Sequence, residues 1–82
     1  MIVTADAYRL EKHSLAISGH RTSVTLERIF WQTLWTIARA RGRSISEIVA
    51  EIDRARLEVD PAPNLSSAIR VFVLNAGLKD GF

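Results

Sequence analysis

The stretch HRTSVTLERIFWQTLWTIARARGRSISE, residues 20–47, decides the fold of this chain. Residues 20–26 alternate in character, which is the period of a β-strand. The pattern then predicts a helix with an apolar stripe, a turn at Gly42 and a second helix that opens at Ser44. A lone strand leaves both of its edges unpaired, so we expect it to pair with the same strand of a second chain. A ribbon of two such strands fits the major groove of DNA.

Toward the N-terminus the pattern weakens. Residues 13–18 alternate and could form an earlier strand, with residues 18–20 as the turn, in which case the chain would form its own hairpin. Residues 1–12 show no clear period, and we expect a flexible N-terminal arm there. This segment also lacks the basic start and apolar core of a signal peptide.

The two faces of the expected strand differ in chemistry. Val24 and Leu26 fall on an apolar face, because successive side chains of a strand point to opposite sides. The other face carries Arg21, Ser23 and Thr25.

Toward the C-terminus the pattern predicts three helices. The first runs to about Arg41, with Gly42 as its left-handed end. The second has the spacing of a capping box from Ser44 to Glu47 and completes a core unit over residues 13–56. A proline-containing linker follows at 57–63, then a third helix at 64–77 that Gly77 ends, and a tail at 78–82.

Composition predicts a small protein that needs a partner. In a chain of 82 residues a single core is marginal, yet 48% of the residues are hydrophobic. Since the apolar stripe of the first helix is too wide for one neighbouring helix, we expect the surplus to lie in a homodimer interface. The expected dimer core consists of Val24, Leu26, Phe30, Leu34, Ile48 and Ile52. Trp31 and Trp35 form a second apolar row, which we also assign to the core or the interface.

Charge and cysteine content limit where in the cell the protein is expected and which partners it is expected to have. Without cysteine, and without an apolar run near the roughly 20 residues that span a bilayer, the chain is expected to be a soluble cytoplasmic protein. Residues 1–43 hold seven basic and three acidic side chains, a net +4, whereas residues 44–82 hold four basic and six acidic ones, a net −2. The positive half favours a polyanion as its partner.

The polar strand face contains the sharpest candidates for recognition of DNA bases. Arg21 can reach guanine O6 and N7 with two hydrogen bonds, and the hydroxyls of Ser23 and Thr25 can donate to or accept from base edges. The plain alternative is an ordinary solvent-facing strand side, which is polar in most proteins.

A second group of candidates suits the phosphates of DNA. The start of the second helix offers free backbone N–H groups and hydroxyls, and two arginines stand beside it. These candidates are Arg41, Arg43, Ser44 and Ser46. A helix-turn-helix would instead place this second helix in the groove, but its exposed Glu47, Glu51 and Asp53 would be repelled by phosphates.

The motifs TSVTL at 22–26 and RGRSISE at 41–47, each beside an apolar helix, resemble the ribbon-helix-helix family of bacterial DNA-binding proteins. The sequence GHRTSVTLE at 19–27, with FW at 30–31 and NLSSAIRVFVL at 64–74, is similar to an uncharacterised branch of that family. The resemblance implies a mainly α fold with a short β-ribbon. It also implies an intertwined homodimer whose antiparallel intermolecular ribbon enters the major groove of DNA. Such a protein is expected to be associated with the nucleoid in the cytoplasm. By position, Arg21, Ser23 and Thr25 match the family's base-reading residues, and Ser44 and Ser46 match its phosphate clamp.

We therefore interpret the chain as a homodimeric, sequence-specific DNA-binding protein, a transcriptional regulator with an additional C-terminal helix. We expect no catalytic residues, no cofactor, no membrane partner and no metal site, since His13 and His20 have no partners at ligand spacing. One alternative is an assembly module that keeps the fold without binding DNA, in which residues 57–82 dock a protein partner or build a tetramer. Another is an antitoxin whose residues 57–82 wrap a toxin and are disordered alone.

Overall fold

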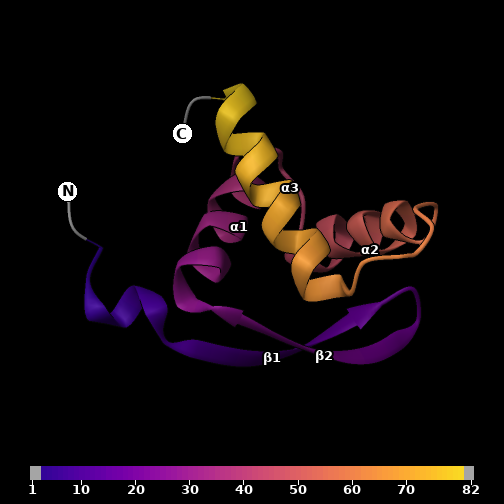
Figure 1. Cartoon of the computed structure of the whole chain (residues 1–82), viewed down its shortest axis with the longest axis horizontal. Coiled ribbons are helices and arrows are strands. Elements are labelled where there is room, and N and C mark those ends of the chain that lie inside the picture. The colour runs from indigo at the N-terminus through magenta and orange to yellow at the C-terminus, as the bar shows by residue number, and fades with distance from the viewer. Residues whose placement is uncertain (1–2, 81–82) are drawn as a thin grey trace.

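The computed structural model describes residues 3–80 as a two-stranded hairpin with three helices packed on one of its faces (Figure 1). This mainly helical architecture with a short antiparallel ribbon is the predicted fold class. The helices η1 (3-10), α1, α2 and α3 span Ala5–Tyr8, Arg28–Ala40, Ile45–Arg56 and Leu65–Asp80, and the strands β1 and β2 span Leu10–Ile17 and His20–Glu27. None of the helices within residues 3–80 combines the length and the apolar character that a membrane span requires.

The ribbon forms within one chain. β1 pairs antiparallel with β2, from Ile17 opposite His20 to Leu10 opposite Glu27. Ser18 and Gly19 make the two-residue turn with φ of 50° and 83°, the left-handed pair that suits the twist of a tight hairpin. The strand that the resemblance pairs between two chains therefore finds its partner locally, where closing so short a loop costs little entropy.

The first strand begins earlier than its local pattern indicates. Within residues 3–12 the expected arm is corrected by η1 and by the start of β1 at Leu10, while residues 1–2 of that arm lie outside the described residues. Two contacts from α1 hold this part of the chain: the Arg28 backbone N–H donates to the Arg9 carbonyl at 2.8 Å, and Trp31 Nε1 donates to the Glu11 carbonyl at 3.0 Å. Such contacts between distant segments leave no period in the local sequence.

The turn and cap between α1 and α2 confirm the sequence predictions. α1 ends at Ala40, and Gly42 has a φ of 63°, which favours a residue without a side chain. Ser44 Oγ accepts from the Glu47 backbone N–H at 3.0 Å, and a Glu47 carboxylate oxygen accepts from the Ser44 N–H at 2.9 Å. The two bonds form the predicted capping box.

α3 is longer than predicted. Its start is capped by Asn64, whose side-chain oxygen accepts from the Ser67 backbone N–H at 2.8 Å. The helix continues through Gly77 to Asp80, although Gly77 was predicted to end it and residues 78–82 to form a tail. Residues 81–82 of that tail lie outside the described residues. A glycine inside a helix costs only about 1 kcal/mol, which the following Leu78 and Lys79, both good helix formers, partly offset.

The core closes inside a single chain. Five of the six expected dimer-core residues are buried among other residues of this chain, and Phe30 is half-buried. α3 contributes Ile69, Val73 and Ala76 to that core, and β1 contributes Ile17. The second neighbour that the wide stripe of α1 requires is therefore α3, and of the six residues only Phe30 keeps partly exposed surface.

Candidate nucleic-acid interface

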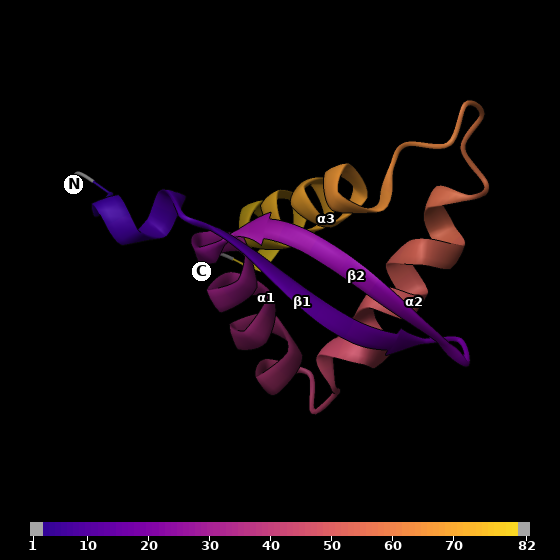
Figure 2. The same ribbon diagram turned by 90° about the horizontal axis from the view of Figure 1, so that it is seen from below.

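The side of the hairpin that faces away from the helices carries mainly polar side chains between Leu10 and Ala16 of β1 and along β2, and we call it the ribbon face. Seen from below, the hairpin crosses in front of all three helices (Figure 2). Antiparallel register places β1 and β2 side chains on this face in opposed pairs: Lys12 opposite Thr25, Ser14 opposite Ser23, and Ala16 opposite Arg21. All six residues are exposed.

The three expected base-reading residues lie together on the ribbon face. Arg21, Ser23 and Thr25 are exposed, whereas Val24 and Leu26 between and beyond them are buried against the helices. The predicted alternation is therefore confirmed. Contact of these residues with bases stays a prediction.

Sequence reasoning missed Lys12 and Ser14 on the same face. It assigned Lys12 to the flexible arm and gave Ser14 no role. The available signal was the spacing of Lys12, Ser14 and Ala16, two residues apart, together with the Ser18–Gly19 turn that sets the register.

The acidic side chains near the ribbon are bound by cations of the same chain. Glu27 shares the ribbon-face side with Thr25, and it accepts from Arg70 Nε at 3.0 Å and from Nη2 at 3.3 Å. These bonds from Arg70 hold the pKa of Glu27 below its ordinary value. Glu11 points to the helix side, where contacts with His13, Arg9 and Arg28 lower its pKa. The carboxylates nearest to the positive charges of the ribbon face, Glu27 and Glu11, are therefore already paired with arginines of the same chain.

The free edge of β2 is covered at one end by α3. Ser66 Oγ donates to the Thr25 carbonyl at 3.0 Å, and Arg70 binds Glu27 two residues further along. α3 therefore lies against the C-terminal half of the edge that an intermolecular ribbon would use.

Three of the four expected phosphate-binding residues are engaged with their own chain. Arg43 Nη1 lies 2.5 Å from a carboxylate oxygen of Glu51, and the Arg41 guanidinium stacks 5.4 Å from the centre of the Phe72 ring. The Ser44 hydroxyl and N–H are both used in the capping box, while Ser46 is half-buried in the first turn of α2. A phosphate at this helix start would have to compete with the carboxylates of Glu47 and Glu51.

The two tryptophans have different surroundings. Trp31 is buried, and its indole packs edge-on against the His13 ring at a centroid distance of 4.4 Å. Trp35 is 54% exposed, with the Arg39 guanidinium 5.3 Å from its ring centre. The core assignment therefore holds for Trp31, whereas Trp35 lies at the surface of the chain.

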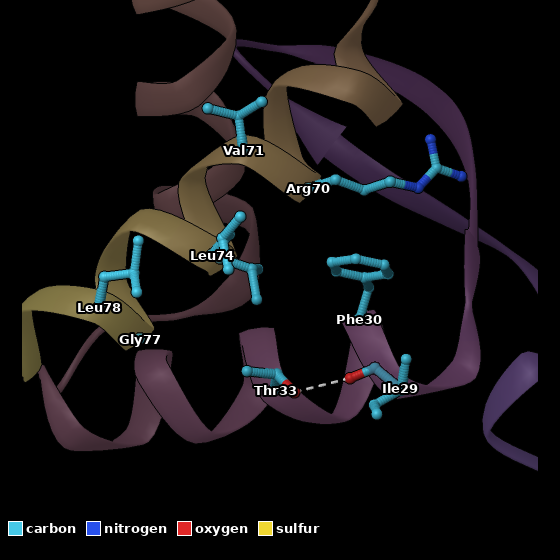
Figure 3. Close-up of a pocket in the computed structure, with 9 residues that line it drawn as sticks. Ile29, Phe30, Thr33, Arg70, Val71, Leu74, Gly77 and Leu78 are labelled. Atoms are coloured by element: carbon cyan, nitrogen blue, oxygen red, sulfur yellow. Dashed lines mark hydrogen bonds between the residues drawn. The ribbon is translucent and has the colours of Figure 1, made fainter. Parts of the chain in front are cut away.

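A second surface, apolar in character, lies between α1 and α3. This α1/α3 groove has a volume of about 550 Å³, and apolar side chains of both helices line it (Figure 3). Ile29, Val71, Leu74 and Leu78 are all exposed there, which is unusual for large aliphatic residues in a group. Arg70 lies at one end, with its guanidinium 5.8 Å from the centre of the Phe30 ring.

Comparisons with known proteins agree with this architecture. A family model described as a ribbon-helix-helix domain matches residues 10–76. The structure is similar to that of an uncharacterized protein from Bordetella pertussis Tohama I, with a TM-score of 0.78 and 27% sequence identity. The match covers 96% of this chain and 64% of that protein, so the chain spans less than two thirds of its length. A search of curated proteins found no match.

Proposed function

Because the chain belongs to the ribbon-helix-helix domain family, we propose that it binds double-stranded DNA sequence-specifically and regulates transcription. Proteins of this family are typically non-catalytic and generally bind DNA as dimers. The observation that carries the proposal is the ribbon face, an exposed polar surface of two paired strands with Arg21 and Lys12 on it. A ribbon of this width is one of the elements that the major groove admits.

In the proposed complex the ribbon face enters the major groove. Arg21 donates two hydrogen bonds to O6 and N7 of a guanine, and the hydroxyls of Ser23 and Thr25 contact neighbouring base edges or phosphates. The in-chain hairpin takes the place of the intermolecular ribbon that the resemblance implies. Ser44, Ser46, Arg41 and Arg43 are proposed to reach flanking phosphates, after their internal partners Glu47 and Glu51 are displaced.

We place the dimer contact at the α1/α3 groove. The same face offers both projecting side chains, Val71, Leu74 and Leu78, and a hollow beside them. A two-fold axis brings one surface against itself, so projections of one protomer can fill the hollow of its partner. Burial of exposed apolar side chains of this size stabilises the dimer.

The decisive test replaces Arg21. We expect Arg21→Ala to weaken binding to a duplex selected from a random library by about 1–3 kcal/mol, the contribution of one bidentate base contact. Fluorescence anisotropy at fixed salt measures this change, and Arg54→Ala, which removes an exposed arginine of α2, is the matched control. Equal affinities for the wild type and Arg21→Ala would remove Arg21 from the interface.

A second candidate function is an assembly module that uses the α1/α3 groove without binding DNA. The specific observation in its favour is the exposed apolar group on α3. DNA affinity that falls steeply with salt supports the first function, and absence of binding to random duplex at low salt supports the second. The antitoxin alternative is weakened because Ile69, Val73 and Ala76 of α3 are buried in the core.

A further inference from the structure

We infer that β1 forms half of the DNA-contact surface, with Lys12 and Ser14 as contact residues beside Thr25 and Ser23. This inference rests on the proposed function and extends it to a strand for which neither the sequence nor the resemblance assigned a role. It also makes each single chain a complete recognition unit, since both strands of the ribbon belong to one chain.

The hairpin register sets the neighbours on the ribbon face. In a two-residue hairpin the residues that flank the turn, Ile17 and His20, form a hydrogen-bonded pair, and the next pair does not. The pairs of the ribbon face are therefore all of the second kind, in which opposed Cα atoms lie only about 4.5 Å apart. Ser14 then lies directly beside Ser23, and Lys12 beside Thr25.

The dimensions of the ribbon face match the groove. Two strands are spaced about 4.8 Å apart, against a groove about 12 Å wide, so side chains of both strands face the base edges together. From Arg21 to Thr25 the strand rises about 13 Å at roughly 3.3 Å per residue, which corresponds to about four base pairs. If β2 reads bases, the β1 side chains opposite it enter the same groove.

The charges on the ribbon face favour the same assignment. Lys12 and Arg21 lie at opposite ends of the face and on opposite strands. Glu27, the carboxylate nearest to Lys12 along this face, is held by Arg70. A lysine on an outer strand can also serve only to prevent edge-to-edge aggregation, and in that role its removal leaves DNA affinity unchanged. The two roles therefore differ in a measurable way.

The test measures the DNA affinity of variants of the full chain. The probes are the selected duplex and an unrelated duplex of equal length. We expect Lys12→Ala to weaken binding about five- to tenfold and to lower the slope of log Kd against log salt by about 1. Ser14→Glu, which places a negative charge between the strands and the bases, should reduce binding at least about 100-fold. Lys79→Ala and Asn75→Glu, at exposed positions in the C-terminal part of α3, are the matched controls. That end of α3 points away from the hairpin (Figure 1).

The outcomes separate this inference from the proposed function. Loss of affinity in Lys12→Ala and Ser14→Glu, with the controls unchanged and the circular dichroism of each variant native, supports a contact surface made of both strands. Loss in Arg21→Ala alone would overturn the role of β1 and leave the proposed function standing. Absence of DNA binding by the wild type would overturn both.

Discussion

Glu27 shows how one residue connects three elements. It is the last residue of β2, it precedes α1 directly, and its carboxylate accepts two hydrogen bonds from Arg70 on α3. Arg70 in turn covers the ring of Phe30 at 5.8 Å. The end of the ribbon, the start of α1 and the first turns of α3 are thereby held in one arrangement.

This ion pair makes stability depend on pH in a defined direction. The hydrogen bonds from Arg70 hold the pKa of Glu27 below its ordinary value in the folded chain. The stabilisation is therefore complete above the unfolded value and is lost as pH falls through the lower folded value. We expect Glu27→Gln to lower the melting temperature at pH 7 and to make the loss of stability below about pH 4.5 shallower.

Thermal unfolding followed by circular dichroism between pH 7 and pH 3 measures this effect. Arg70→Met should likewise make the fall in melting temperature at acid pH shallower. The double variant should cost less than the sum of the single ones, because each change removes the same interaction. Additive losses would show that the two residues act separately.

Residue-level prediction from the sequence worked where only the strand period was needed. Arg21, Ser23 and Thr25 fall on one face because alternate residues of any strand do. Lys12 and Ser14 were not added to that face: the Ser18–Gly19 turn signals the register, but the contacts of Trp31 and Arg28 that extend β1 to Leu10 leave no local signal. The Ser44–Glu47 capping box was predicted because it is local. The partner of Arg43 was not predicted, because Glu51 is eight residues away and reaches Arg43 only after α2 has formed.

At the scale of elements, the capping box at the start of α2 makes a measurable contribution to the free energy of unfolding. Ser44→Ala leaves the Glu47 N–H without its acceptor, and we expect a loss of about 1 kcal/mol in the free energy of unfolding. For a domain of this size that corresponds to a melting temperature lower by roughly 4–8 °C. Differential scanning calorimetry checks it.

Ser46→Ala is the matched control two residues further along. It removes a hydroxyl from the first turn of α2 but leaves both bonds of the capping box in place. We expect its stability to stay within about 0.5 kcal/mol of the wild type. Equal losses in the two variants would mean that the Ser44 hydroxyl has no special capping role.

The existence of α1, α2 and α3 could be predicted, but their neighbours could not. Apolar spacing and caps located α1, α2 and α3, since both features are local. The width of the α1 stripe correctly indicated a second neighbour, but the pattern does not say whether that neighbour belongs to the same chain. α3 and β1 occupy the place that the sequence reasoning assigned to a partner subunit.

At the scale of the whole molecule, the α1/α3 groove can be tested as the dimer contact. Leu74 is 64% exposed in the single chain, so Leu74→Glu should leave the fold intact. In a dimer closed through the groove, the same change buries an unpaired charge, and we expect the dimer dissociation constant to rise roughly 100-fold or more. Analytical ultracentrifugation across micromolar concentrations measures it.

Leu57→Glu offers a control of equal chemistry. Leu57 follows α2, is 61% exposed and does not line the groove. Dissociation caused equally by both variants would move the dimer contact away from α1 and α3. A wild type that sediments as a monomer at these concentrations would contradict the dimer itself.

The in-chain hairpin also has a kinetic consequence. The most distant partners in the sheet, Leu10 and Glu27, are separated by only 17 residues, and the turn between the strands has two. Contacts so close in sequence form early, because little chain has to be searched before they meet. A ribbon shared between two chains must wait for a collision, whereas this one closes in a first-order step at any dilution. A newly made chain therefore completes the ribbon face, the proposed DNA-contact surface, before it has met another copy.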